Sequence, residues 1–200
     1  EMNRTEYDAF SQRPNPNTYP GHKGMIHQWF CQQNAEEFWS LLDALSKNDT
    51  KVVLEIGSAA GGTLPFFDQL VGTGGMVIGM EPDSVGGFSA VSKKYSSYEP
   101  LSQLVLLNGY SHDPVIYQTV NRTLTNFGRQ LDFLFIDGDH SYYGAVSDFE
   151  RYGPLVRKGG IIGFHDVAIM PECRKAFDEA SGTKKEILPV HYMGIGLVWK

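Results

Sequence analysis

The sequence predicts an α/β domain built on a mostly parallel β-sheet with helices on both faces. Five short apolar runs recur along the chain, and near-continuous runs of this length are typical of strands buried on both faces. The segments between them are mixed in polarity and long enough for crossover helices, which favours parallel pairing. Of the 200 residues, 42% are hydrophobic and 20% are charged, so the chain can bury one ordinary core. We therefore expect a single domain over residues 1–200.

Each element follows from the local pattern. Residues 1–24 are polar and interrupted by proline and glycine, which favours an irregular arm with little helix or strand of its own. We set this arm at residues 1–30 and the core at 31–200. Apolar residues at helical spacing predict a helix over 32–47. The apolar runs predict strands over 51–56, 75–80, 101–108, 131–137 and 159–166, and residues 185–200 favour two more strands joined by a very short turn, hence an antiparallel pair.

Composition excludes several classes of protein. The net charge is −6 and there is no long basic run, so we expect no nucleic-acid partner. The apolar runs are too short to cross a bilayer, and no signal peptide is visible. Cys31 and Cys173 lie far apart, with neither metal-type spacing nor a disulfide framework. A reducing, cytoplasmic location is the simplest expectation. The first residue is Glu1 rather than Met, which is consistent with a trimmed upstream segment.

A glycine-rich turn follows the first predicted strand. In "LEIGSAAGGT", Gly57 is followed by Gly61 and Gly62, and Ala59 stands where the dinucleotide fingerprint G-x-G-x-x-G needs glycine. Small residues let a ligand lie against the backbone, and a helix opening near Gly62 can offer N–H groups to a carboxylate or a phosphate. The second strand ends at Glu81, placed to accept hydrogen bonds from ribose hydroxyls. The alternative for Glu81 is a solvated carboxylate at a strand end.

Five motifs in sequence order resemble those of class I S-adenosylmethionine-dependent methyltransferases. They are "HKGMI" (22–26), "EIGSAAGGT" (55–63), "GMEPD" (79–83), "NGYSHD" (108–113) and "GIGLVWK" (194–200). The resemblance covers the chain from about residue 20 to the end. It implies a Rossmann-like sheet of seven strands in the order 3-2-1-4-5-7-6, with the last strand antiparallel. It also implies that the Lys-Gly segment of 22–26 closes over the cofactor.

The same resemblance assigns roles to residues around S-adenosylmethionine. Gly57, Ser58 and Thr63 would lie near its methionine part, with Glu55 near the amino group. Glu81 would bind the ribose, and two residues after the third strand would border the adenine. The whole set expected to bind the cofactor is Glu55, Gly57, Ser58, Ala60, Gly61, Thr63, Glu81, Pro82, Ser111, His112 and Asp137.

Polar residues end the fourth and fifth predicted strands. Asp137, Asp139 and His140 follow the fourth, and His165 and Asp166 follow the fifth. Because adjacent parallel strands end at the same edge of a sheet, we expect these groups to converge beside the cofactor. Methyl transfer to oxygen needs aligned reactants and a base for the hydroxyl proton. We expect His140, Asp137 and Asp166 to be catalytic, while Asp139 or Ser141 can instead cap the next helix.

A divalent metal would position the hydroxyl and lower its pKa. "DGDHSYYGAVSDFERYGPLVRKGGIIGFHD" resembles the branch of catechol, caffeoyl-CoA and macrolide-sugar O-methyltransferases and cephalosporin-hydroxylase-like proteins, in which Asp137, His165 and Asp166 match the metal positions. His165 stands where those relatives carry an acid, and one histidine with two carboxylates suits manganese, iron or zinc better than magnesium. Two alternatives stay open. In the first, the site holds no metal, and His140 pairs with Asp137 or Asp166 to act as a general base. In the second, His165 is a buried histidine bonded to backbone.

Several residues have plain structural interpretations. We expect Asp148 and Glu150 to be solvated on a helix, and Tyr142 and Tyr143 to pack against the sheet. Gly159 and Gly160 would make a tight turn into the fifth strand.

The leading hypothesis is an S-adenosylmethionine-dependent O-methyltransferase acting on a hydroxyl of a sugar or secondary metabolite, with magnesium or manganese as the candidate metal. The main alternative is an inactive cofactor-binding or oligomerising scaffold of the same fold. An NAD(P) oxidoreductase is disfavoured because the fingerprint is missing, and a nucleic-acid methyltransferase because no Asn/Asp-Pro-Pro-Tyr/Phe follows the fourth strand. We expect Met25, Trp29, Met170 and Arg174 in the substrate pocket, and Tyr7, Phe10 and Tyr19 in a lid or a homodimer contact.

Overall fold

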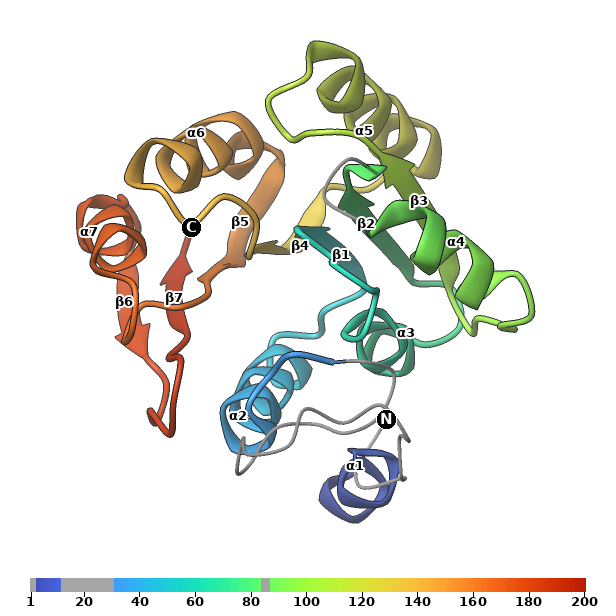
Figure 1. Cartoon of the computed structure of the whole chain (residues 1–200), viewed down its shortest axis with the longest axis horizontal. Coiled ribbons are helices and arrows are strands. Elements are labelled where there is room, and N and C mark those ends of the chain that lie inside the picture. The colour runs from blue at the N-terminus through green and yellow to red at the C-terminus, as the bar shows by residue number, and fades with distance from the viewer. Residues whose placement is uncertain (1–2, 12–30, 84–86) are drawn as a thin grey trace.

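The computed structural model describes residues 3–11, 31–83 and 87–200, and these form one seven-stranded sheet flanked by helices (Figure 1). The strand order is β3-β2-β1-β4-β5-β7-β6. Strands β3, β2, β1, β4 and β5 pair in parallel, and β7 is antiparallel to both β5 and β6. This order and these directions confirm the predicted fold. The strands are β1 (Val52–Ile56), β2 (Met76–Glu81), β3 (Gln103–Asn108), β4 (Leu131–Ile136), β5 (Val156–Phe164), β6 (Lys184–Ile187) and β7 (Gly196–Trp199).

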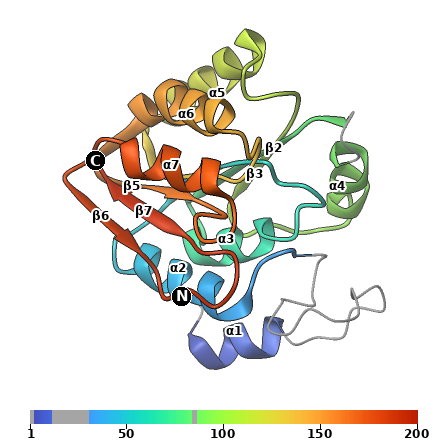
Figure 2. The same cartoon turned by 60° about the vertical axis from the view of Figure 1, so that its left-hand side comes forward.

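Two layers of helices bury the two faces of the sheet. One apolar cluster joins alternate strand residues to three helices, α5 (Pro114–Phe127), α6 (Tyr142–Tyr152) and α7 (Pro171–Glu179). The opposite cluster joins the other strand residues to α1 (Arg4–Ser11), α2 (Ala35–Ser46), α3 (Leu64–Val71) and α4 (Phe88–Tyr95). In Figure 2, α5 and α6 lie above the sheet and α1, α2 and α3 below it. Since both faces are covered, β1, β2 and β4 are buried along their whole length, which explains their unbroken apolar runs.

The N-terminal arm departs from the prediction. Residues 4–11 form the helix α1 where we expected irregular chain. Tyr7 is completely buried, its ring lies 5.1 Å from that of Trp39 and 5.7 Å from that of Phe66, and its hydroxyl donates to the carbonyl of Ala35 at 2.6 Å. Packing against α2 therefore stabilises a helix that the local sequence does not predict. Tyr7 is a core residue rather than part of a lid. The "HKGMI" segment, Phe10, Tyr19, Met25 and Trp29 lie outside the residues or side chains that the structure describes.

Strand β5 begins earlier than predicted. It starts at Val156 and contains Gly159 and Gly160, so these glycines do not form a turn before the strand. The pairing with β4 shifts register between Leu131 and Phe133, and Gly159 has a φ of +74°. The two glycines therefore make an irregularity within the strand, of the kind glycine tolerates best.

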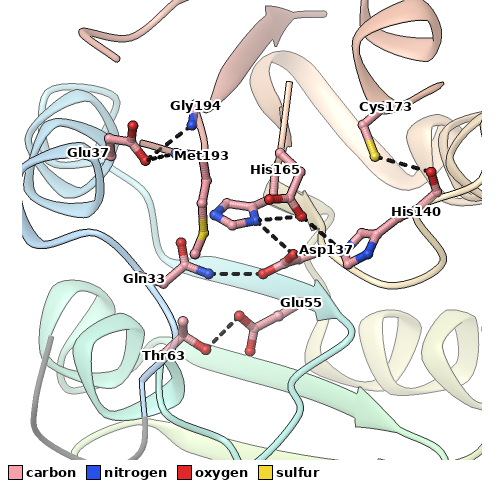
Figure 3. Close-up of polar contacts among 11 residues, drawn as sticks. Gln33, Glu37, Glu55, Thr63, Asp137, His140, His165, Cys173, Met193 and Gly194 are labelled. Carbon is pink, nitrogen blue, oxygen red and sulfur yellow. Dashed lines mark hydrogen bonds and ion pairs between the residues drawn. The ribbon is translucent and has the colours of Figure 1, made fainter. Parts of the chain in front are cut away.

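A buried carboxylate ties α2 to the connection between β6 and β7. This connection spans residues 188–195 and is longer than the very short turn predicted from sequence. Glu37 is 1% exposed, and its two oxygens accept the backbone N–H groups of residues 191–194 at 2.5–3.2 Å. Figure 3 shows Glu37 beside Met193 and Gly194. The connection is thus held by four charge-assisted hydrogen bonds to one side chain.

We expect Glu37→Ala to lower the free energy of unfolding by more than about 3 kcal/mol, because charge-assisted hydrogen bonds are lost together and the N–H groups are left without an acceptor. Glu36→Ala is the matched control, since Glu36 is the adjacent acid and is bonded to Arg4 at the surface. Surface ion pairs of this kind contribute about 0–1 kcal/mol. Chemical denaturation of both variants makes the comparison, and equal losses would show that Glu37 has no special role.

Candidate active site

The carboxyl ends of β1, β2, β4 and β5 open onto one cavity of about 590 Å³, a size typical of small-molecule sites. It is lined by residues that follow these strands and by the segment after β3. Of the predicted cofactor-binding residues, Glu55, Gly57, Ser58, Thr63, Glu81, Pro82, Ser111, His112 and Asp137 line the cavity. Ala60 and Gly61 do not, and Ala59 and Gly62 line it in their place. Gly61 instead lies against α4, where its carbonyl accepts the hydroxyl of Tyr95 at 2.6 Å.

The glycine turn brings β1 and β4 into close contact. Gly57 has a φ of +88°, and a Cβ at this position would lie 2.1 Å from the carbonyl oxygen of Asp137. Only glycine lets the two strand ends approach this closely. Gly57 therefore sets the distance between the predicted cofactor turn and the predicted chemical centre.

Glu55 faces the cavity from the end of β1. It is 1% exposed, and its Oε1 accepts the hydroxyl of Thr63 at 2.5 Å. That hydroxyl makes no helix-capping bond at the start of α3. Glu55 Oε2 is buried without a hydrogen-bond partner among the described residues. Burial raises the pKa of Glu55 to about 8, opposed by the Thr63 hydrogen bond and reinforced by the charge of Asp137.

This pKa predicts a pH-dependent stability. With the folded pKa at about 8 and the reference value at 4.5, the folded chain holds a proton at Glu55 that the unfolded chain has lost in this window. The contribution of Glu55 to the free energy of unfolding should therefore be fully present below pH 4.5. It should fall as the pH rises towards 8, by up to about 1.4 kcal/mol per pH unit. Glu55→Gln, which stays neutral, should remove this part of the slope. Urea denaturation from pH 5 to 8 measures it, and parallel profiles for the two proteins would contradict the assignment.

Glu81 ends β2 and belongs to the cavity wall. Its Oε2 accepts the N–H of Ala59 at 2.9 Å, and it is only 9% exposed. A Cβ at Gly87 would lie 2.2 Å from Glu81 Cγ, so the chain entering α4 packs directly on this side chain. Burial raises the pKa of Glu81, while the Ala59 hydrogen bond opposes the shift. The Glu81 carboxylate is therefore fixed by a hydrogen bond and by packing, and it is not a solvated group at a strand end.

The segment after β3 forms the far end of the cavity. The rings of Tyr110 and His112 stack at 5.1 Å, and the carbonyl of Ser111 accepts the hydroxyl of Tyr152 at 2.7 Å. Asp148, expected to be solvated, is 2% exposed and accepts a hydrogen bond from the Ser111 side chain. Burial raises the pKa of Asp148 to about 6. The periodicity of α6 did not predict that Asp148 is buried. The helix packs against the loop after β3, and this contact buries a polar position. The neighbouring Glu150 is exposed, as predicted.

Two carboxylates and two histidines meet at the ends of β4 and β5 (Figure 3). His165 Nδ1 lies 3.0 Å from Asp137 Oδ1 and 3.2 Å from Asp166 Oδ2. His140 Nε2 lies 3.0 Å from Asp166 Oδ2 and 3.9 Å from Asp137 Oδ1. His165 therefore lies within ion-pair distance of both acids. Neither of its ring nitrogens has a hydrogen-bond partner among the described residues, backbone included, which overturns the alternative of a histidine bonded to backbone. Asp166 has a φ of +61°, an uncommon conformation for a residue other than glycine and one that often marks functional positions.

Mutual pairing shifts the pKa of all four groups. Hydrogen bonds to Asp137 and Asp166 raise the pKa of His140 to about 10. Burial opposes charge on His165, but Asp137 and Asp166 outweigh it and raise its pKa to about 10. Burial likewise opposes ionisation of Asp137 and Asp166, yet the histidines hold the pKa of both acids below the usual range. These directions favour ionised acids and protonated histidines within the cluster.

The cluster offers two alternative donor sets for a divalent metal, namely Asp137 and Asp166 with either His140 or His165. One ligand atom each from Asp137, His140 and Asp166 lie within 4.8 Å of one another. Metal–donor bonds of about 2.1 Å place neighbouring donors roughly 3.0–3.5 Å apart, and most contacts in the cluster fall in that range. The predicted third ligand, His165, contacts the same two oxygens. Two carboxylates with one imidazole favour manganese, iron or zinc over magnesium.

The residues on either side of His140 have structural roles. Ser141 caps α6 by accepting the N–H of Gly144 at 3.1 Å, and Asp139 Oδ1 accepts the N–H of Ser141 at 2.9 Å. Tyr142 pairs with Glu179 and packs under Lys175, whereas Tyr143 is 82% exposed rather than packed on the sheet. The sequence therefore identified the cap correctly and the burial of Tyr143 wrongly.

Two methionine side chains also line the cavity. Met170 lies before α7 and Met193 belongs to the connection held by Glu37, and both line the cavity. Arg174 does not line it, because its guanidinium pairs with Asp178 one turn along α7. Sequence reasoning missed Met193 and Gln33. Gln33 precedes α2, is 3% exposed and donates from Nε2 to Asp137 Oδ2 at 3.0 Å.

Other predicted features have simple outcomes. Cys31 and Cys173 are both free and buried. Among the helices of the described residues, none has the length and apolar character needed to cross a membrane.

A family model described as "Methyltransferase domain" matches residues 54–167. Among curated proteins, the uncharacterized protein R132 of Acanthamoeba polyphaga mimivirus is 34% identical over 129 residues, covering 64% of this chain and 56% of that protein. Rhamnosyl O-methyltransferase of Mycobacterium tuberculosis is 21% identical over 140 residues, covering 68% and 54%. The chain thus spans a little over half the length of these relatives.

Solved structures share the fold. An O-methyltransferase from Bacillus cereus in complex with SAH superposes with a TM-score of 0.65 at 17% identity, covering 86% of this chain and 84% of that one. TomG of Streptomyces achromogenes, an O-methyltransferase of tomaymycin synthesis in complex with SAM, gives 0.65 at 15%, covering 84% and 80%. MycE of mycinamycin biosynthesis, in complex with Mg, SAH and mycinamycin VI, gives 0.51 at 18%, covering 78% and 47%.

Proposed function

Because this chain belongs to the methyltransferase-domain family, we propose that it transfers the methyl group of S-adenosylmethionine to a hydroxyl of a sugar or secondary metabolite. One observation carries the proposal. A single cavity runs from Glu81, at the end of β2, to the acids and histidines at the ends of β4 and β5. A ribose-binding acid at one end and a proton-accepting cluster at the other is the arrangement that this reaction requires.

The cavity wall fits the cofactor. Glu55 Oε2 and Ser58 Oγ are buried close to each other and have no well-aligned hydrogen bond among the described residues. Buried polar atoms are normally bonded, so this pair leaves hydrogen-bonding capacity for a bound polar group. The methionine end supplies an ammonium and a carboxylate for such atoms. Glu81 keeps Oε1 for the ribose, since Oε2 is taken by Ala59.

The acids and histidines at the ends of β4 and β5 would carry out the chemistry. S-adenosylmethionine supplies a methyl group on a sulfonium. The side chain of His140 is 47% exposed and can reach an acceptor hydroxyl. We therefore assign His140 the role of general base, with Nε2 accepting the proton of that hydroxyl. His165 is 4% exposed and cannot reach it, so with Asp137 and Asp166 it would hold the metal. In the present arrangement the two acids keep His140 protonated at neutral pH. A divalent cation would draw on the same acids, lower the pKa of His140, and lower that of the hydroxyl as well.

The acceptor class rests on the wall and on the relatives. Met170 and Met193 offer an apolar surface beside the acids, which suits the C–H face of a sugar ring. One relative is named as a rhamnosyl O-methyltransferase, and two structural neighbours belong to mycinamycin and tomaymycin biosynthesis. These likenesses favour a sugar or secondary-metabolite hydroxyl.

The test is calorimetric titration with S-adenosylhomocysteine, with and without manganese or magnesium, and with NADH as the control. We expect a micromolar Kd for S-adenosylhomocysteine, no heat with NADH, and a manganese site that binds more tightly than magnesium. A screen of glycosides by mass spectrometry should then show a gain of one methyl group, lost with a chelator. Absence of S-adenosylhomocysteine binding by the folded protein would refute the proposal. Binding without turnover of any acceptor would favour the scaffold alternative.

A further inference from the structure

The start of α2 and the residue before its N-cap reach both sides of the cavity. Gln33, immediately before the N-cap residue Asn34, donates to Asp137, and Glu37 holds the backbone that carries Met193. Both lie outside residues 54–167, which the family model matches. Figure 3 shows Gln33 and Glu37 extending from the same side of the cavity towards β4 and the β6–β7 connection.

The two carboxylate oxygens of Asp137 have different partners, because the amide of Gln33 bonds to one of them. Asp137 Oδ2 accepts from Gln33 Nε2 at 3.0 Å, while Oδ1 faces His165 at 3.0 Å and His140 at 3.9 Å. Gln33 is a neutral donor at all relevant pH values. It therefore fixes the rotation of the carboxylate without cancelling the charge that the histidines use.

The burial of Gln33 has no evident benefit for stability. The side chain is 3% exposed, yet its Oε1 has no hydrogen-bond partner among the described residues. A buried acceptor without a partner costs free energy, and an apolar residue would fill this volume at lower cost. The bond to Asp137 is what the glutamine adds here.

We propose that Gln33 is a positioning residue, which orients the Asp137 carboxylate so that Oδ1 faces the reacting groups. This inference rests on the proposed function. Partners that orient active-site carboxylates and metal ligands typically change activity by about 10–100-fold when they are removed. Gln33 would thus extend the site beyond the part of the chain that the family model describes.

The test compares Gln33→Leu and Gln33→Met with Gln118→Leu. Gln118 is an exposed glutamine on α5 that does not line the cavity, so it controls for the loss of an amide. Gln33→Met keeps the length of the side chain and guards against misfolding. With the glycoside found in the screen, both Gln33 variants should lose about 10–100-fold in kcat, with the Kd of S-adenosylhomocysteine within about threefold of wild type. Gln118→Leu should change neither quantity.

A second readout needs no acceptor. In protein labelled with ¹⁵N-histidine, the ring signals of His140 and His165 should shift in the Gln33 variants, because Asp137 contacts both rings. The His112 signal, at the far end of the cavity, is the internal reference. Unchanged His140 and His165 signals would overturn the inference, as would a loss of cofactor affinity equal to the loss of kcat. If the wild type shows no turnover, the proposed function fails while the histidine signals still decide the role of Gln33.

Discussion

Replacing His140 by alanine is expected to lower kcat by about 10²–10⁴-fold, the usual contribution of a general base. His140 is the histidine of the cluster whose side chain is exposed to the cavity, and its Nε2 lies 3.0 Å from Asp166. It contacts neither Glu81 nor the segment after β3 in the described contacts. The Kd of S-adenosylhomocysteine should therefore stay within about twofold of wild type. Methyl transfer to the acceptor found in the glycoside screen gives kcat, and calorimetry gives Kd.

His112→Ala is the matched control, because His112 is a second histidine of the same cavity at its opposite end. Under the proposed function His112 borders the adenine, so its loss should raise the Kd by about 10-fold and leave kcat at saturating cofactor nearly unchanged. The two variants thus separate proton transfer from cofactor binding. If His140→Ala retained more than about a tenth of wild-type kcat, another group would have to accept the proton.

Replacing Gly57 by alanine should be among the most damaging single changes to the fold. The new Cβ would lie 2.1 Å from the Asp137 carbonyl oxygen, and the φ of +88° is itself unfavourable for alanine. Strain and overpacking together should cost about 3–5 kcal/mol of unfolding free energy. S-adenosylhomocysteine binding should also be lost, since β1 and β4 must separate at the cavity.

Gly128→Ala isolates the effect of the close contact. Gly128 ends α5 in the left-handed region with a φ of +74°, but nothing lies within 4 Å of the position that the new methyl group would take. This substitution should therefore introduce backbone strain alone, about 1–2 kcal/mol. Thermal or urea denaturation of both variants gives the difference. Similar losses would mean that β1 and β4 do not approach as closely as described.

The sheet and the acids at its edge were predictable because each depends on local pattern. Buried parallel strands need continuous apolar runs, so the order of elements was readable from the sequence. Parallel strands also deliver their ends to one edge, so Asp137 and Asp166 could be placed together before their distance was known. The antiparallel end of the sheet followed from two runs that no crossover helix separates.

What sequence could not supply depends on contacts between distant residues. Gln33 meets Asp137 across 104 positions, and no local spacing marks a glutamine for such a contact. Tyr7 orders its helix through rings of α2 and α3. Asp148 occupies a position that looks solvated in the periodicity of α6, but the loop after β3 covers it. In each case the partner, rather than the residue itself, determines the outcome.

The Glu37 contacts also bear on how the chain is synthesised. Glu37 leaves the ribosome long before the backbone it binds, because 154–157 positions separate it from residues 191–194. Until those residues emerge, α2 can dock only on the sheet strands already made, and its carboxylate stays in water. The wall that carries Met193 is therefore completed late in translation, and nascent chains that stop before this point would carry an open cavity. Such long-range closure is slow compared with local helix formation, so we expect this wall of the cavity to form after the helices.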